Sequence, residues 1–347
     1  MIIRQDYMIM IDKKSLKLKE FDFQTSLDVG LLIAAGGFEN RALTFSGKIN
    51  KDKNFIEDSL ILKYESKYIG NDDNYKKLSK LLFEITGRQP EIVDINLDFP
   101  LKSCENIKNA INKKKNEISK NNVIIDISAL TNLYITASLH SCIEASLKTK
   151  IVYTEARYYF PPKKEKEKII KSWQDQDYKM AARYLQSEGL KDVIIHPDFQ
   201  GNFRQGKKNC LMIIIGYEPN RIEGLIDSFA PSRLIIYYGV SPHNELKWRT
   251  QFSKDLHKNL FSNWYVHEAD ISTLNIDEIY NTIHNDFTII REDFDVSIAP
   301  QNSKFQTIAS YLFWREHPEV QLLFTTPVLF SPERYSKGSR RTFEINL

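Results

Sequence analysis

Cysteine is scarce in this sequence, and the common motifs for cofactor and metal binding are missing. The 347 residues include three cysteines, Cys104, Cys142 and Cys210, which lie far apart and form no C-x-x-C pair. This pattern argues against a disulfide framework and a zinc site, and it favours a reducing compartment. The sequence also has no GxGxxG, P-loop, GxSxG or HExxH motif, which argues against NAD enzymes, P-loop NTPases, serine hydrolases and zinc proteases. We therefore predict no metal and no cofactor.

Long apolar runs are also missing. No run approaches the ~20 consecutive apolar residues that a membrane span requires. The opening residues, MIIRQDYMIMIDKKSLK, carry acids and lysines where a signal peptide needs an unbroken apolar segment. We predict a cytoplasmic protein with no membrane partner. The formal net charge of +3 is too small to indicate a duplex-DNA binder by itself.

An ordered series of strands and helices occurs twice in the chain. Each series opens with an apolar run, Val29–Ala35 in one half and Leu211–Ile215 in the other, as expected for a central strand buried on both faces. Strands and helices then alternate in the same order in both halves. Such alternation requires right-handed crossovers and a mainly parallel sheet. We predict an α/β fold of two tandem Rossmann-like domains with mainly parallel sheets, joined by a helical insertion.

The predicted domain boundaries follow from this repeat. We assign residues 1–161 to an N-terminal Rossmann-like domain, residues 162–206 to a helical linker, and residues 207–347 to a C-terminal Rossmann-like domain with a basic tail. The linker contains KKEKEK and an amphipathic segment, Trp173–Gln186, and we interpret it as a solvated connector rather than a nucleic-acid-binding tract. The tail, Ser331–Leu347, contains SKGSRR, and we expect it to be a mobile basic strip.

A related loop follows the first strand of each half. It is G-F-E-N-R in one half and G-Y-E-P-N-R in the other. The glycine lets the backbone approach a ligand closely, and the arginine is suited to clamping a phosphate or carboxylate. The glutamate can hold a ribose hydroxyl, bind a metal or act as a general base; alternatively it begins a helix or pairs with the arginine. The candidate ligand-binding residues of these loops are Gly37, Glu39, Arg41, Gly216, Glu218 and Arg221.

A second polar cluster precedes the last long helix of each half. The segment D-I-S-A-L-T-N begins at Asp126, and we match it with D-V-S-I-A-P-Q-N-S-K, which begins at Asp295. Helix capping explains one hydroxyl in each segment but not the whole set. Lys304 puts a positive charge at a helix N-terminus, where the helix dipole disfavours it and a bound anion would justify it. The candidate ligand-binding residues here are Ser128, Thr131, Asn132, Ser297 and Lys304.

Three further side chains lie at the same expected edge of the sheets. His243, in G-V-S-P-H-N, has no partner nearby in the sequence, which favours a structural role. Tyr158 and Tyr159 are suited either to stacking on a base or to packing between the domains.

At the D-[IV]-S step and the polar helix start that follows it, the sequence resembles the CARF family, the CRISPR-associated Rossmann-fold domains. The resemblance implies a ligand site made by the loops Gly36–Arg41 and Gly216–Arg221 and the segments Asp126–Asn132 and Asp295–Lys304. It also implies that this site binds cyclic oligoadenylates or related nucleotides across a two-fold junction. No nuclease or helix-turn-helix pattern follows the second half, so the signal would pass to a partner effector protein, or the ligand would be degraded.

We predict that a composite cleft between the halves binds a nucleotide or cyclic oligonucleotide, and that the protein is a sensor or accessory in prokaryotic antiviral defence. Two alternatives stay open. One is a nucleotide or nucleic-acid hydrolase or transferase, with Glu39, Glu218 and Asp126 as catalytic candidates. The other is a structural subunit of a defence complex. For a catalytic site, the expected reaction is ring-nuclease-like, metal-independent phosphodiester cleavage by the ligand's own 2′-hydroxyl.

Overall fold

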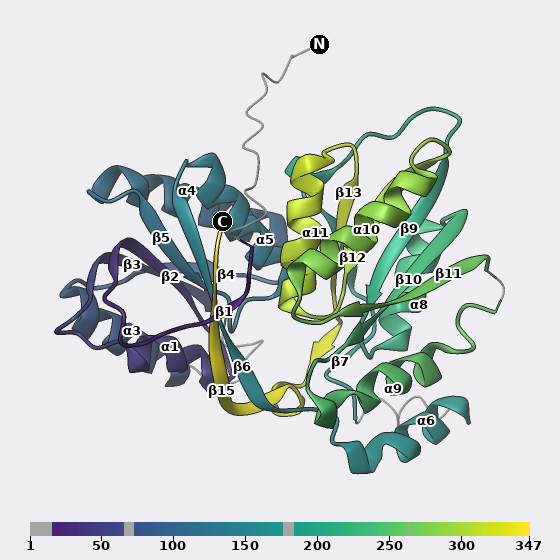
Figure 1. Ribbon diagram of the computed structural model, residues 1–347, viewed down its shortest axis with the longest axis horizontal. Helices are drawn as coiled ribbons and strands as arrows, with labels where there is room; N and C mark the ends of the chain where they lie inside the picture. The colour runs from purple at the N-terminus through teal and green to yellow at the C-terminus, as the bar shows by residue number, and fades with distance from the viewer. Residues whose placement is uncertain (1–15, 66–72, 176–183, 263) are drawn as a thin grey trace.

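The computed structural model describes residues 16–65, 73–175, 184–262 and 264–347, and it consists of two α/β halves side by side (Figure 1). Within the described residues, one half is built on a seven-stranded sheet and the other on a six-stranded sheet, each largely parallel. Helices flank both sheets. The predicted fold class, two Rossmann-like units with mainly parallel sheets, is therefore confirmed.

The N-terminal sheet is built around β2, Asp28–Gly36, which is buried from Val29 onward as a central parallel strand should be. The other parallel strands of this sheet are β3 (Phe55–Tyr64), β4 (Glu91–Ile95), β5 (Asn122–Asp126) and β6 (Lys148–Tyr159), in the order β6-β5-β2-β3-β4. Its helices are η1 (Asn40–Leu43), α1 (Thr44–Lys48), α3 (Asp73–Thr86), α4 (Pro100–Glu117) and α5 (Asn132–Glu144).

The C-terminal sheet has the same strand order around β9, Lys208–Ile215. The other parallel strands are β10 (Arg233–Val240), β11 (Val266–Ser272), β12 (Phe294–Pro300) and β13 (Gln321–Thr326), in the order β11-β10-β9-β12-β13. Its helices are α8 (Pro219–Phe229), η4 (Asn244–Leu246), α9 (Trp248–His257), α10 (Ile276–Ile290) and α11 (Lys304–Glu316). In each half the first strand is central, and the chain builds outward from it in the same order.

Helices cover both faces of each sheet. In the N-terminal half, α1 and α3 pack on one face through Phe45, Leu78 and Leu82, while α4 and α5 cover the other. In the C-terminal half, α8 covers one face, and α10 and α11 cover the other. Because α5 and α11 contact each other, one hydrophobic core continues from the first half into the second (Figure 1). Close packing of this core holds the two halves in a defined relative position.

The linker between the halves is helical only in part. It contains the helical turn η2, Lys163–Glu165, and helix α6, Lys166–Gln174, which packs against α9. Residues 176–183, which belong to the predicted helix at 173–186, lie outside the described residues. The linker continues with short β7 (Ser187–Glu188), β8 (Asp192–Ile195) and the turn η3 (Pro197–Phe199). Strand β8 joins the C-terminal sheet as an antiparallel edge strand, which the sequence did not indicate. The domain boundaries stay a prediction.

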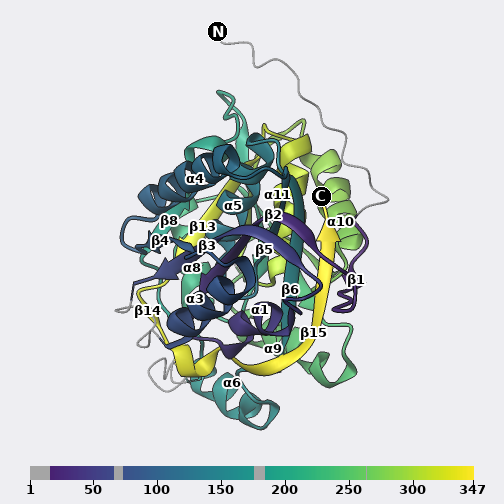
Figure 2. The same cartoon turned by 90° about the vertical axis from the view of Figure 1, so that its left-hand side faces the viewer.

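The C-terminal tail lies in the sheet of the other half. After short β14 (Leu329–Phe330) and η5 (Pro332–Arg334), strand β15 (Ser336–Asn346) runs antiparallel beside β6 (Figure 2). The short strand β1, Lys19–Glu20, pairs with its other edge. The expected mobile basic strip is thus a sheet strand instead. Phe343 and Ile345 anchor it, because they alternate along the strand and are both buried.

We expect Phe343→Ala to lower the free energy of unfolding by about 3–5 kcal/mol, the usual range for removing a buried phenylalanine ring. Phe343 is 7% exposed and belongs to the core that both halves share. Urea unfolding followed by circular dichroism measures the change. The control Lys337→Ala removes an exposed side chain of the same strand and should stay within about 0.5 kcal/mol of the wild type. Equal stability of the two variants would show that β15 does not anchor the fold.

Candidate functional site

The strand order creates a topological switch point in each sheet. From β2 and β9, the chain first builds the strands on one side and then crosses to β5 and β12 on the other. In open α/β sheets, ligands bind in the crevice at the carboxyl ends of such neighbouring strands. The helices that follow β5 and β12 are α5 and α11, which pack against each other. Both crevices therefore open toward the junction of the halves.

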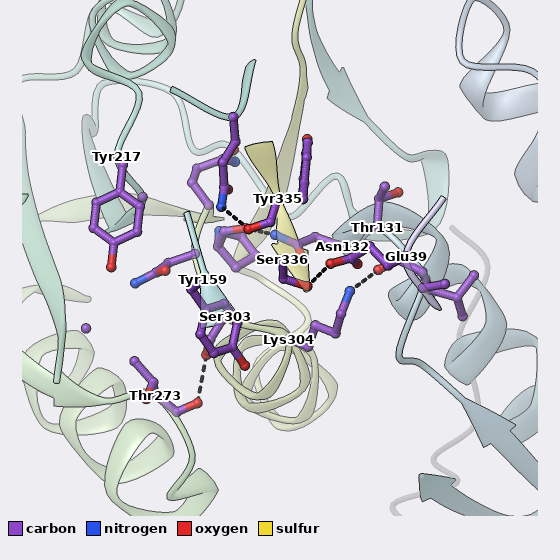
Figure 3. Close-up of a pocket in the computed structure, with 18 of the residues that line it drawn as sticks. Glu39, Thr131, Asn132, Tyr159, Tyr217, Thr273, Ser303, Lys304, Tyr335 and Ser336 are labelled. Carbon is purple, nitrogen blue, oxygen red and sulfur yellow. Dashed lines mark hydrogen bonds between the residues drawn. The ribbon is translucent and has the colours of Figure 1, made fainter. Parts of the chain in front are cut away.

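A cavity of about 330 Å³ lies at this junction and is lined by loops of both halves (Figure 3). Its volume is in the range of small-molecule sites. The predicted site residues that line it are Gly37, Glu39, Arg41, Thr131, Asn132, Gly216, Glu218, Arg221 and Lys304. Asp126, Ser128 and Ser297 do not line it. The structure thus brings the residues of both first-strand loops together with the first residues of α5 and α11.

The first residues of α5 and α11 reach across the junction in opposite directions. Helix α5 begins at Asn132, whose Nδ2 donates a hydrogen bond of 2.7 Å to the backbone carbonyl of Pro300. Helix α11 begins at Lys304, whose ammonium donates to the backbone carbonyl of Leu130. These two residues occupy equivalent positions in their halves but differ in charge. The cavity therefore has an ammonium group at one of its two helix ends.

The ammonium group of Lys304 is poorly solvated. Burial lowers the pKa of Lys304 to about 7, and the positive charge of Arg41 acts in the same direction, whereas Glu39 and Asp126 oppose the shift. Figure 3 shows the side chain extending toward the part of the cavity where Glu39 and Thr131 lie. The N-terminus of α11 also favours a negative charge at this point. A bound anion would satisfy both the ammonium and the helix end.

One wall of the cavity is a buried polar network around Glu39 and Arg41. Arg41 Nη2 donates to Glu39 Oε2 at 2.8 Å, and neither side chain is more than 9% exposed. Arg41 Nη1 donates to the hydroxyl of Tyr153 at 3.1 Å and to the carbonyl of Thr154 at 3.2 Å. Ser336, at the start of β15, donates to the other oxygen of Glu39. Arg41 is therefore engaged by protein groups, with its guanidinium at the cavity wall.

The second half contains the corresponding pair. Arg221 Nη2 donates to Glu218 Oε2 at 2.9 Å, and Arg221 Nη1 donates to Ser187 at 3.3 Å. The sequence left open whether each glutamate pairs with its arginine, and the structure shows that pair in both halves. Glu39 and Glu218 each hold a guanidinium, so neither is placed as a free general base.

Gly37 and Gly216 allow the loops of each half to touch. A Cβ atom at Gly216 would lie 2.9 Å from the carbonyl oxygen of Gln301, and one at Gly37 would lie 3.1 Å from the Cβ of Ala129. In both halves, the glycine loop after the first strand therefore lies directly against the loop after the fourth strand.

Asp126 and Ser128 lie beneath the cavity wall rather than on it. Asp126 Oδ1 accepts the backbone N–H of Ser128 at 2.9 Å, and burial raises the pKa of Asp126 to about 6. Ser128 Oγ accepts the backbone N–H of Thr154 at 2.9 Å, which ties the loop after β5 to β6. Both side chains thus hold the loop in place, which differs from the expected contact with a ligand.

Ser297 does not occupy the position that the D-x-S match implies. Strand β5 ends at Asp126, whereas β12 has only begun at Asp295 and continues to Pro300. Ser297 is consequently buried inside the strand, where it donates to Gln321 Oε1 at 3.1 Å. The match failed because a three-residue pattern does not record where along a strand it lies.

A histidine–glutamate pair in the cavity was not predicted. His243 Nε2 lies 2.8 Å from Oε1 of Glu155, and both residues line the cavity. His243 follows β10 in one half and Glu155 lies on β6 in the other, 88 residues apart. The sequence placed His243 after an expected strand, but nothing in it indicated that Glu155, on β6, would be its partner. Tyr159 also lines the cavity, whereas Tyr158 does not and is 66% exposed.

The described part of the chain contains neither a cluster of metal ligands nor a helix suited to crossing a membrane. No group of three or more histidine, cysteine, aspartate or glutamate side chains in this part of the chain is arranged to hold a metal ion. Among the described helices, none combines the length and the apolar character needed to cross a bilayer.

The site is thus a cavity at the switch points of two Rossmann-like units, with charged, polar and aromatic side chains in its lining. By sequence, the chain matches no family model and no curated protein. In fold it is similar to a type III CRISPR defence DNA nuclease activated by cyclic oligoadenylate, with a TM-score of 0.48 and 8% identity. That match covers 86% of this chain and 65% of the nuclease, so the chain spans less than two thirds of its length.

A second similar structure is the apo form of a lipopolysaccharide outer core galactosyltransferase, WaaB. Its TM-score is 0.23 and its identity 10%, with 86% of this chain and 92% of that chain covered. The nuclease activity and the galactosyltransferase activity belong to those two proteins.

Proposed function

We propose that the cavity binds a nucleotide or short cyclic oligonucleotide and that the protein is a sensor or accessory in prokaryotic antiviral defence. The observation that carries the proposal is the convergence of both switch-point crevices on one cavity, with the Lys304 ammonium inside it. The CARF resemblance implies this arrangement of two units across a junction. In that family the junction binds cyclic oligoadenylates.

A phosphate is the group that best fits the two helix ends. The N-termini of α5 and α11 both meet the cavity, and helix N-termini favour anions through their unpaired N–H groups and dipole. Lys304 adds a positive charge that is poorly hydrated because it is buried. The bound phosphate would therefore lie beside Lys304 rather than on Arg41 or Arg221, whose guanidinium groups already pair with Glu39 and Glu218.

The remaining cavity wall is suited to the sugar and base. Aromatic side chains from both halves line it, and they offer ring faces to a base. These aromatic residues are Phe38, Tyr64, Tyr134, Tyr153, Tyr159, Tyr217, Phe305, Phe324, Phe330 and Tyr335. Carbonyl, hydroxyl and amide groups lie between them, in keeping with a ligand that has both flat and polar parts. The sensor then passes the binding signal to a partner effector protein.

The test is a thermal-shift and calorimetric screen of the whole chain against ribonucleoside mono- and triphosphates, linear dinucleotides and cyclic oligoadenylates of several ring sizes. At least one probe should raise the melting temperature, because a ligand that binds only the folded state stabilises it. The shift should shrink in high salt, since screening weakens charge–phosphate attraction. Failure of every probe to bind the folded protein would overturn the proposal.

A further inference from the structure

Glu155 offers the cavity an acceptor oxygen that the protein leaves unused. An ionised carboxylate only accepts hydrogen bonds, so His243 Nε2 donates to Oε1, at 2.8 Å. Oε2 is buried and has no hydrogen-bond partner among the described residues, and the Nε of Arg341 stays 4.0 Å away. The side chain of Glu155 is 4% exposed and lines the cavity. Since buried polar atoms are rarely left without a partner, Oε2 is suited to accepting a hydrogen bond from a ligand.

This carboxylate lies on the same wall of the cavity as Lys304. The ring of Tyr153 packs edge-on against Phe305, the residue after Lys304, with their centroids 5.1 Å apart. Glu155 is two residues further along β6, so it points to the same face of the strand as Tyr153, ~7 Å beyond it. All four residues line the cavity. The wall thus carries an ammonium group and, at a spacing on the scale of one nucleotide, an acceptor carboxylate.

The two halves do not present these groups twice. The first residue of α5, which is equivalent to Lys304, is the uncharged Asn132. The strand equivalent to β6 is β13, and it ends in Thr325 and Thr326 rather than in a carboxylate. A ring with two-fold symmetry repeats the same groups at both of its ends. A molecule with two different ends matches this cavity better.

We propose that the ligand is a short linear ribonucleotide, with its 5′-phosphate beside Lys304 and the hydroxyls of its terminal ribose donating to Glu155. This inference rests on the proposed nucleotide binding and narrows it to linear molecules. A ribose hydroxyl supplies the donor that Oε2 lacks, whereas the carboxylate repels a phosphate. The cavity volume of about 330 Å³ is at the small end of the ~300–1,000 Å³ range of ligand sites, which suits a mononucleotide or dinucleotide better than a larger ring.

Four dinucleotide probes, built on the base that binds best in the screen, test this inference by calorimetry. The reference probe is linear, with a 5′-phosphate and a terminal ribose. Removal of the 5′-phosphate, or replacement of the terminal ribose by 2′,3′-dideoxyribose, should each weaken binding about 10- to 100-fold, because each removes a hydrogen bond to a charged group. The cyclic dinucleotide of the same base lacks both ends and should bind at least about 10-fold more weakly than the reference.

Glu155→Gln tests whether the carboxylate recognises the terminal ribose. The preference for ribose over dideoxyribose should fall about three- to tenfold, because a hydrogen bond to a neutral group contributes less. Affinity for the dideoxy probe should stay as in the wild type, which also shows that the variant is folded. The control Glu245→Gln makes the same change at a glutamate that is 56% exposed and outside the cavity, and it should leave all four affinities unchanged.

Three outcomes would contradict these expectations. Equal or tighter binding of the cyclic dinucleotide would overturn the inference and leave nucleotide binding in place. An undiminished ribose preference in Glu155→Gln, or an equal loss of affinity for the ribose and dideoxy probes, would overturn the contact between the terminal ribose and this carboxylate. Failure of every probe in the screen would overturn both the inference and the proposed function.

Discussion

Lys304→Met should weaken binding of the nucleotide ligand about 10- to 100-fold. A hydrogen bond to a charged group contributes about 1.5–3 kcal/mol, and about 1.4 kcal/mol corresponds to a factor of ten in affinity. Methionine keeps the length and most of the volume of the side chain while removing its charge. Calorimetry with the best probe of the screen measures the loss. Unchanged affinity would show that the anion does not lie beside Lys304.

The same residue predicts how affinity depends on pH. Burial lowers the pKa of Lys304 to about 7, and a bound anion must raise it again, so binding above neutral pH requires the uptake of a proton. Below about pH 7 the ammonium is already formed and affinity is at its highest. Above that value, affinity should fall by at most about tenfold per pH unit. Calorimetry in buffers of different ionisation enthalpy measures the proton directly.

Two control variants distinguish this effect from general damage. Lys258→Met removes an exposed lysine outside the cavity and should alter neither affinity nor its pH dependence. Lys304→Met should bind weakly at every pH.

Without ligand, the unfolded chain holds more protons than the folded one between about pH 7 and 10.5, so the stability of the wild type rises across this window. The Met variant lacks that rise and is not destabilised at neutral pH.

Glu39→Gln should lower the free energy of unfolding by about 3–5 kcal/mol, because it leaves the buried guanidinium of Arg41 without its anionic partner. The two groups are 2.8 Å apart and 7% and 9% exposed. Glu39 also accepts a hydrogen bond from Ser336, so its loss further loosens the start of β15. Urea unfolding at neutral pH measures the change. Replacement of both residues, Glu39→Met with Arg41→Met, should recover part of the loss, since no unpaired charge is then buried.

An exposed ion pair provides the matched control. Lys102 and Glu105 lie 2.8 Å apart, as close as the buried pair, but are 64% and 57% exposed. Glu105→Gln should therefore leave the free energy of unfolding almost unchanged, because solvent screens an exposed ion pair. Equal losses for Glu39→Gln and Glu105→Gln would show that burial does not determine the contribution of the Glu39–Arg41 pair.

Local features of the sequence predicted the elements well. The apolar run Val29–Ala35 became the buried strand β2, because a strand covered on both faces must be apolar throughout. The alternation of strands and helices predicted parallel sheets, since such connections cross over in one hand. The glycine loops follow the central strands β2 and β9, so they lie at the switch points of the two sheets. These predictions depend only on neighbours along the chain.

Features that depend on contacts between distant parts of the chain were predicted wrongly or were not predicted. The tail with Phe343 and Ile345 shows alternation, but nothing local indicates that its partner strand is β6 in the other half. The D-V-S triplet at Asp295 lies at the start of β12, because the length of a strand is decided by the sheet around it. His243 found its partner in Glu155 only when the two halves came together.

Taken alone, the amino-acid sequence determined the order of strands and helices and the polar character of the loops at their ends, because periodicity and turn chemistry act over a few residues. The tertiary structure decided which of these loops share a cavity, which strand the tail joins, and which charges are buried in pairs. Those properties depend on the packing of α5 against α11 and on the removal of water between the halves, and no short segment encodes either.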